Sequence, residues 1–205
     1  MKKFELTNEF ITNMFGTKLF RIRALVEFGD VEAGELGGYV EKESNLGHDD
    51  NAWVYDNAWV YGNARVYGDA QVSGDARVCG DALVCGNARV CGNALVYDNA
   101  WVYGNARVCG DALVCGNARV CSDEDYAYAH GFGSVNRTTT FFRLKDGGVG
   151  VRCGCFYGTL AQFRDKIRET HGETKKAQEY LMLADLMELR FEEDENEVGN
   201  RKYVE

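Results

Sequence analysis

The sequence predicts a mainly β protein built around a parallel β-helix, and two observations predict it. Valine recurs at every sixth position from Asn51 to Ser122, always two residues after an alanine, which gives twelve consecutive units. Nearly every unit reads Asp/Asn-Ala-x-Val-y-Gly/Asp, so a Gly-Asx or Asp-Asn pair, which tolerates turn conformations, follows each short strand. A helix is rejected because a period of six drifts around a 3.6-residue turn and the frequent glycines oppose helix formation.

Each unit has an inner and an outer side. Side chains alternate along a strand, so alanine and valine share the inner face while positions x and y point outward. The predicted structural core is therefore the set of twelve repeat valines: Val54, Val60, Val66, Val72, Val78, Val84, Val90, Val96, Val102, Val108, Val114 and Val120.

Residues 1–50 are predicted to form an N-terminal β cap. The apolar run Leu19–Leu25 suits a strand, Gly34–Gly38 suits a turn, and Tyr39-Val40 resumes an extended segment. Open ends of a solenoid need covering, because exposed strand edges promote aggregation. Residues 51–122 then form the repeat domain.

Residues 123–205 are predicted to hold a β-hairpin, two helices and an acidic tail. Thr138–Leu144 and Val149–Phe156 read as strands joined by a Lys-Asp-Gly-Gly turn. Apolar spacing predicts helices from Thr159 to about Thr170 and from Thr174 to about Glu192.

The first helix carries Leu160, Phe163 and Ile167 on one face, which we expect to cap the solenoid. A protein partner from the host or a phage is the alternative use of this C-terminal segment. Residues 192–197 are expected to form a solvated acidic tail.

Composition and charge exclude several classes of protein. The 205 residues contain 23 Lys and Arg against 32 Asp and Glu, a net charge of −9 that disfavours nucleic-acid binding. No apolar run is long enough to span a membrane. The start, Met1–Leu6, shows no signal-peptide pattern, so we expect a cytoplasmic protein.

The repeat resembles the hexapeptide-repeat family of left-handed parallel β-helices, whose units carry an aliphatic residue with a small residue two positions earlier. This resemblance implies a left-handed solenoid, three units per coil, about four coils, and a homotrimer packed side by side. The flanking segments Leu19–Leu25, Gly37–Val40 and Cys155–Leu160 resemble a group of uncharacterised proteins carried by phages and prophages, which implies a phage or prophage origin.

Residues separated by three repeat units are expected to stack one coil above another, which makes the outer surface predictable. Successive cysteines then lie on different faces, so they cannot converge on zinc within one subunit, and we expect no metal and no cofactor. Only Cys91 and Cys109 stack directly. Without a secretion signal, reduced thiols are expected.

Acyl-CoA-dependent acyl transfer is the enzymatic activity that the resemblance implies, and it typically uses histidine as general base between subunits. The chain has only His48, His130 and His171, and none interrupts the repeat. His130 is a weak catalytic candidate, because a surface or capping role is favoured for it. A cleft at a subunit boundary that contains His130 or His48 would support this alternative.

Duplicated blocks favour a scaffold over a catalyst. Tyr55–Val66 recurs as Tyr97–Val108, seven units later, so with three units per coil the copies lie on different faces. A ligand site confined to one face would not survive that rearrangement. The predicted function is a non-catalytic structural or binding protein. A second alternative is capture of a small nucleotide between subunits by outward Trp and Arg side chains.

Overall fold

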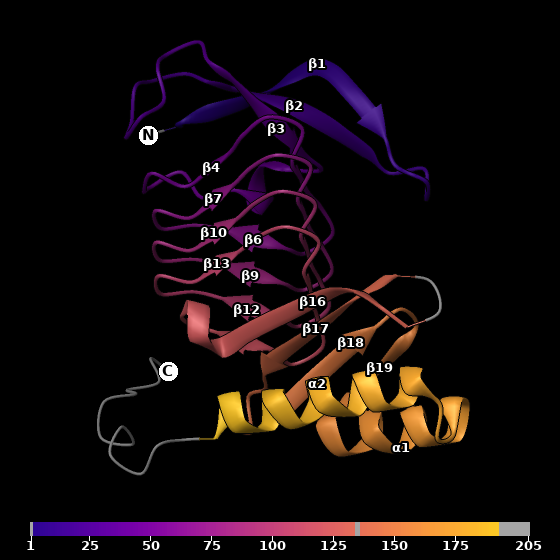
Figure 1. The fold of residues 1–205 in the computed structure, drawn as a ribbon. Coiled ribbons are helices and arrows are strands. Elements are labelled where there is room, and N and C mark those ends of the chain that lie inside the picture. The colour runs from indigo at the N-terminus through magenta and orange to yellow at the C-terminus, as the bar shows by residue number, and fades with distance from the viewer. Residues whose placement is uncertain (1, 134–135, 193–205) are drawn as a thin grey trace.

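The computed structural model describes residues 2–133 and 136–192. An N-terminal β cap, a parallel β-solenoid of about five turns, and a C-terminal sheet covered by two helices follow one another along the molecule (Figure 1). The mainly β fold with two C-terminal helices agrees with the prediction.

Each repeat unit forms a two-residue strand, and the strands stack in three parallel columns. The columns are β4-β7-β10-β13, β5-β8-β11-β14 and β6-β9-β12-β15. Partners lie three repeat units apart, as in Gln71 with Arg89 and Val72 with Val90, which confirms the stacking register. The strands are β4 (Trp53–Val54), β5 (Trp59–Val60), β6 (Arg65–Val66), β7 (Gln71–Val72), β8 (Arg77–Val78), β9 (Leu83–Val84), β10 (Arg89–Val90), β11 (Leu95–Val96), β12 (Trp101–Val102), β13 (Arg107–Val108), β14 (Leu113–Val114) and β15 (Arg119–Val120).

The solenoid has about one turn more than the four that the repeat predicts. Strand β3 (Leu36–Val40) pairs in parallel with β5, with Tyr39 opposite Trp59, and Leu46 forms a parallel bridge with Val66. The two members of each pair are further apart in the chain than the 18 residues of three repeat units. The reason is that eight positions, and not six, separate Leu46 from Val54. This longer interval breaks the period, which hides the first turn in the sequence. A 3₁₀ helix, Glu43–Asn45, precedes Leu46.

The solenoid interior consists of the small repeat side chains. All twelve repeat valines and the alanines two residues before them are completely buried. This core is continuous with the apolar residues of both ends, including Phe4 and Ile22 from the cap and Phe142 from the C-terminal sheet.

Two long antiparallel strands close the N-terminal end. β1 (Phe4–Thr12) pairs with β2 (Lys18–Ala24), and β2 pairs with β3, so the β5 column continues into a seven-stranded sheet. Trp53 stands at an outward repeat position but is fully buried, because the rings of Phe4 and Phe28 pack edge-on against it.

An antiparallel sheet closes the C-terminal end. The predicted hairpin forms β17 (Arg137–Arg143) and β18 (Val149–Cys153), and the flanking strands β16 (Tyr126–Phe132) and β19 (Phe156–Thr159) extend it to four. A 3₁₀ helix, Asp123–Asp125, connects the last coil to β16. The hairpin is therefore the centre of a larger sheet.

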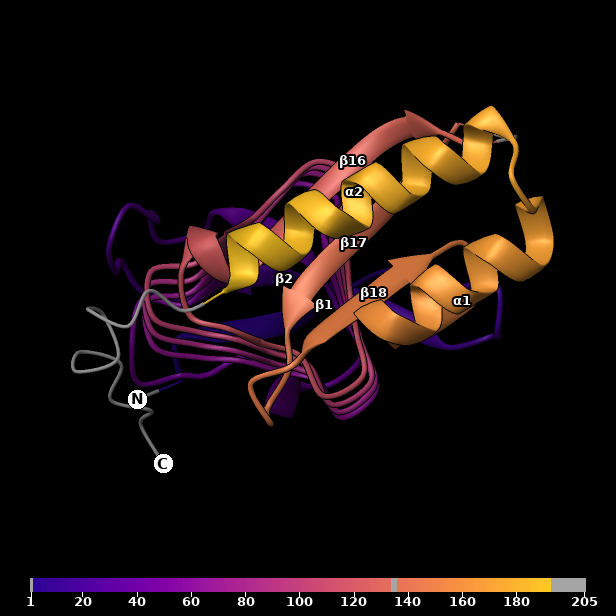
Figure 2. The same cartoon turned by 60° about the horizontal axis from the view of Figure 1, so that its bottom comes forward.

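One face of this sheet packs against the solenoid core, and the other packs against the two helices. Phe142 belongs to the solenoid core, whereas its neighbour Phe141 packs with the helices α1 (Leu160–His171) and α2 (Lys175–Phe191). The expectation that Leu160, Phe163 and Ile167 cap the solenoid directly is wrong: the sheet closes the solenoid, and the helices cover the far side of the sheet (Figure 2). The predicted acidic tail lies outside the described residues from 193 onward.

Neither described helix is long and apolar enough to cross a bilayer.

Side chains from the cap satisfy carbonyl groups at the first edge of the solenoid ladder. Within the ladder, the N–H of one coil donates to a carbonyl of the next, as Trp53 N does to Ala70 O at 3.0 Å. At the N-terminal edge, Lys3 Nζ donates to Asp50 O at 2.6 Å and Ala52 O at 2.8 Å. The buried Asn45 Nδ2 donates to Gly62 O at 3.2 Å and Ala64 O at 2.8 Å.

Acceptor side chains satisfy N–H groups at the opposite edge. Asp123 accepts from Arg107 N at 2.6 Å, Thr140 Oγ1 from Leu113 N at 2.9 Å, and Asp125 from Cys121 N at 2.9 Å. Donor side chains at one end and acceptor side chains at the other thus substitute for the missing coils.

We expect Asn45→Leu to destabilise the protein by about 1–3 kcal/mol, because the buried carbonyl of Ala64 and the partly buried carbonyl of Gly62 lose their donor. Urea unfolding followed by circular dichroism measures this free energy. The control is Asn63→Leu, since Asn63 is exposed and bonds Asp81 across a corner at 3.1 Å. Equal losses in both variants would contradict the role of Asn45 in closing the edge.

Candidate functional site

Two of the three outward y columns alternate tyrosine with cysteine. Tyr61 contacts Cys79 of the next coil, and burial followed by this contact raises the pKa of Tyr61 to about 12. Tyr97 and Cys115 form the equivalent pair on the same face, with the pKa of Tyr97 also raised, mainly by burial. A small thiol side chain beside each tyrosine ring lets the two fit in one column, which explains the alternation of Tyr and Cys without metal chemistry.

Two of the three outward x columns place an arginine next to a tryptophan. The Arg77 guanidinium lies 4.3 Å from the ring centre of Trp59, and that of Arg119 lies 4.1 Å from Trp101, with three repeat units between the members of each pair. Such cation–π stacking covers one face of each indole within the chain. A nucleotide base would have to displace an arginine to stack on that face.

Cys91 and Cys109 form a disulfide between successive coils, with 4.7 Å between their Cα atoms. The expectation of reduced thiols is therefore wrong for this pair. The physical reason is the register: in this column two cysteines are direct neighbours, at a Cα separation that suits a disulfide. The other six cysteines, all among the described residues, are not disulfide-bonded.

Within the described residues, no three His, Cys, Asp or Glu side chains gather as a metal site.

The three histidines lie in separate parts of the fold. His130 is an exposed residue of β16, and its Nδ1 lies 2.9 Å from Thr138 Oγ1. His171 ends α1 and stacks on Tyr180 with 5.9 Å between the ring centres. His48 lies in the first turn of the solenoid, at the opposite end of the molecule.

The longer interval beside His48 creates a surface recess, called here the His48 recess. It has a volume of about 490 Å³ and is lined by Glu43, Ser44, Leu46, Gly47, His48, Asp49, Arg65, Val66 and Tyr67. A smaller recess of about 230 Å³ shares His48 and Asp49 and reaches Lys3 and Phe28. Sequence reasoning noted His48 but missed this concavity, whose signal is the interval of eight positions before Val54.

The contacts of His48 define its protonation. Its ring stacks on Phe4 with 4.4 Å between centres, and Nδ1 accepts a hydrogen bond from Lys3 N at 3.2 Å. Burial lowers the pKa of His48 below its usual value. The neutral ring therefore carries its proton on Nε2, which makes that nitrogen a hydrogen-bond donor and not a general base.

Lys3 is a buried cation with a structural task. Only 3% of its surface is exposed, and Nζ lies 4.5 Å from the ring centre of Phe28 while donating to two backbone carbonyls. Burial lowers the pKa of Lys3 to about 8, against the opposing effect of Asp50 and Asp49. With these donors engaged, Lys3 holds the cap to the first coil.

Comparison with known proteins supports the repeat fold. A family model described as the YdcK beta solenoid repeat matches residues 58–74, 70–86, 88–104 and 100–116. These stretches lie within the solenoid and cover less than half of the chain. No curated protein matches the sequence. The chain is therefore a repeat β-solenoid protein, similar over these stretches to that family.

Replacing Lys3 with Met should change how stability depends on pH. Between about pH 8 and the unfolded value near 10.5, the unfolded chain binds the Lys3 proton while the folded chain has released it. The free energy of unfolding of the wild type should therefore rise relative to Lys3→Met across this window. Urea unfolding of both proteins at several pH values measures the difference, with Lys2→Met as the exposed control. A difference that does not change with pH would contradict the lowered pKa of Lys3.

Replacing Cys109 with Ser should lower stability by about 3 kcal/mol under non-reducing conditions, because the disulfide closes an 18-residue loop. Reductant should lower the free energy of unfolding of the wild type to that of the variant. The control is Cys155→Ser, which replaces an exposed thiol. Peptide mass spectrometry should find Cys91 linked to Cys109. Absence of this link, together with unchanged stability, would contradict the pairing.

Proposed function

We propose that this protein is a non-catalytic scaffold of phage or prophage origin, which associates with other protein chains through one lateral face of the solenoid. The Trp59 face consists of eight outward side chains of one column. They are the first residue of each of β5, β8, β11 and β14 and the residue two positions later. The composition of this face is the observation that carries the proposal.

The Trp59 face is the least charged side of the solenoid. Its eight outward residues include one charge, Arg77, and otherwise consist of Trp59, Leu95, Leu113, Tyr61, Cys79, Tyr97 and Cys115. At its C-terminal end Cys115 is already buried within the chain, and Arg152 lies over the ring of Tyr97, so the part open to another chain is centred on Trp59 and Leu95. Each of the other two faces carries two arginines at the equivalent positions. Depletion of charge with enrichment of aromatic residues is typical of the centre of a protein interface.

The closed ends of the solenoid direct association to its sides. β1 and β2 cover one end and β17 covers the other, so the ladder edges are not open for pairing with another chain (Figure 1). The resemblance to hexapeptide-repeat proteins implies a side-by-side homotrimer, which would bring lateral faces of neighbouring chains together.

Acyl transfer is supported less well. Nδ1 of His48 is occupied by the Lys3 backbone, and His130 lies exposed on the C-terminal sheet. A phage or prophage origin rests on the flanking sequence segments, and the genes that neighbour the coding sequence test it: a chromosomal region without phage genes would count against it.

Leu95→Glu should reduce the mass of the assembly threefold, because it places a carboxylate at the centre of the Trp59 face. Size-exclusion chromatography with light scattering measures the mass, and circular dichroism checks that the solenoid is retained. The control is Gln71→Glu, at a partly exposed outward position of the β4-β7-β10-β13 column. An unchanged mass for Leu95→Glu would contradict association through the Trp59 face.

A further inference from the structure

Helix α2 presents an exposed apolar stripe on the side away from its buried face. Met182, Leu186 and Leu189 are 71%, 54% and 68% exposed, and their i, i+4, i+7 spacing places them in one row. The buried side of the same helix holds Tyr180, Ala184 and Met187. A solvated helix normally has polar residues on its outer side, so this stripe points to an interface.

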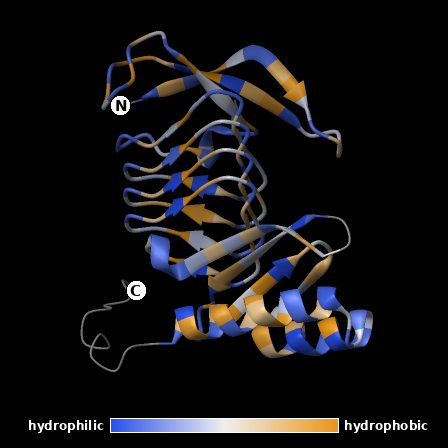
Figure 3. Cartoon of the chain, in the orientation of Figure 1, coloured by the Kyte–Doolittle hydropathy of each residue, from blue (hydrophilic) through white to orange (hydrophobic). Residues whose placement is uncertain are grey.

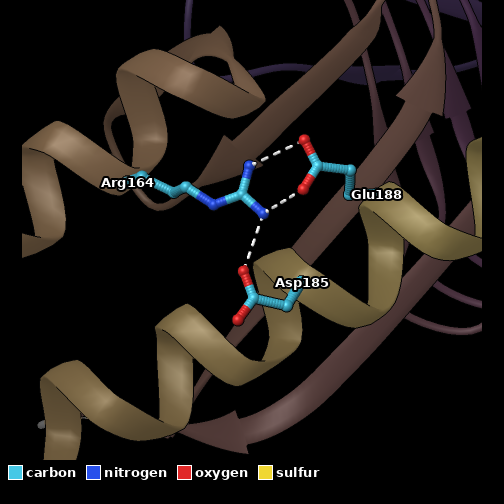
Figure 4. Close-up of polar contacts among 3 residues, drawn as sticks. All are labelled: Arg164, Asp185 and Glu188. Carbon is cyan, nitrogen blue, oxygen red and sulfur yellow. Dashed lines mark hydrogen bonds and ion pairs between the residues drawn. The ribbon is translucent and has the colours of Figure 1, made fainter.

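The acidic flank of α2 is neutralised within the chain. Arg164 of α1 binds Asp185 Oδ1 at 2.7 Å and Glu188 Oε2 at 2.8 Å through Nη2 (Figure 4). These charges join the two helices side by side. They therefore do not select a partner for the stripe.

The other flank of the stripe carries Glu179, beside Lys175, toward its N-terminal end and Arg190 toward its C-terminal end. Glu179 lies seven residues before Leu186 and Arg190 lies four residues after it, so the three share one side of the helix. Glu179 makes a long ion pair with Lys175 at 3.9 Å, and Arg190 donates to Asp123 O at 3.3 Å. Arg190 has further donors, and both residues are at least partly exposed.

We propose that a second copy of this chain covers the stripe, with the two α2 helices antiparallel about a two-fold axis near Ala184. Met182 and Leu186 are equally far from Ala184 along the helix, and Glu179 and Arg190 are centred within half a residue of the same point. One antiparallel register therefore places Met182 against Leu186 of the second copy and Glu179 against its Arg190.

In this antiparallel pair, the flank that carries Glu179 and Arg190 meets the same flank of the second copy, with opposite charges facing each other. A parallel pair would instead place this flank against the one that carries Asp185 and Glu188. The self-complementary charges of the Glu179 flank therefore select the antiparallel second copy.

This pairing joins two chains end to end. The helices lie beyond the C-terminal sheet at the end of the molecule, and hydrophobic residues occupy much of α2 (Figure 3). A contact there leaves the lateral faces of the solenoid free. The end-to-end contact is thus independent of the lateral association proposed above, and an experiment can contradict either proposal without affecting the other.

The first test is the mass of the assembly. Sedimentation velocity should show that Leu186→Glu halves the mass of the wild-type assembly, whether or not lateral association also occurs. The control, Ala161→Glu, adds the same charge at an exposed position of α1 and should leave the mass unchanged. Circular dichroism checks that both variants fold. An unchanged mass for Leu186→Glu would show that a different protein covers the stripe and would overturn the proposal.

The second test uses charge reversal to establish orientation. Glu179→Arg leaves only cations on this flank, and Arg190→Glu places an anion at each end of the predicted contact, so each variant alone should associate more weakly than the wild type. An equimolar mixture of the two should associate again, because both contacts of the mixed antiparallel pair are then attractive. A mixture that associates no better than its components would overturn the antiparallel arrangement.

Discussion

The hydrogen-bond ladder between successive coils is the interaction on which the whole molecule depends. The solenoid strands are two residues long, and the core between them consists mainly of valine and alanine, so each coil is held by its neighbours above and below. Such a ladder is stable only if its two ends are closed. Lys3 and Asn45 supply donors at one end, and Asp123, Asp125 and Thr140 supply acceptors at the other.

The corners between strands impose the second constraint. A Cβ on Gly68, at a φ of 71°, would lie 2.9 Å from the backbone nitrogen of Gly86 in the next coil. Glycine is therefore required there both by conformation and by the close approach of the two chain segments. Asp56 and Asp98 occupy equivalent corners at positive φ, and each carboxylate accepts a hydrogen bond from a glycine N–H one coil away. Corner residues thus add polar contacts to the backbone ladder.

The same architecture explains where binding can occur. Inward side chains are committed to the core, and the outward columns already contain internal pairs such as Trp59 with Arg77. What remains includes the partly exposed apolar side chains of the Trp59 face and the exposed stripe of α2. Because Nδ1 of His48 accepts from Lys3 N, Nε2 is the donor nitrogen of the neutral ring.

The sequence alone determined the features that depend on a strict local period. A valine at every sixth position specifies the core, and the interval of three repeat units predicts the neighbours of Trp59 and Trp101 and the adjacency of Cys91 and Cys109. Apolar spacing and turn residues likewise predicted the central hairpin and both helices.

Only the tertiary structure decided the features that join distant segments. The first solenoid turn was not predicted, because its spacing is longer than the six-residue period. Strands β1 and β16 were not predicted either, because each forms through pairing with another strand that no local pattern encodes. The ladder-closing role of Lys3 depends on carbonyls almost fifty residues away. For α2, apolar residues occur on both sides of the helix, and only its packing against the sheet decides which side stays exposed.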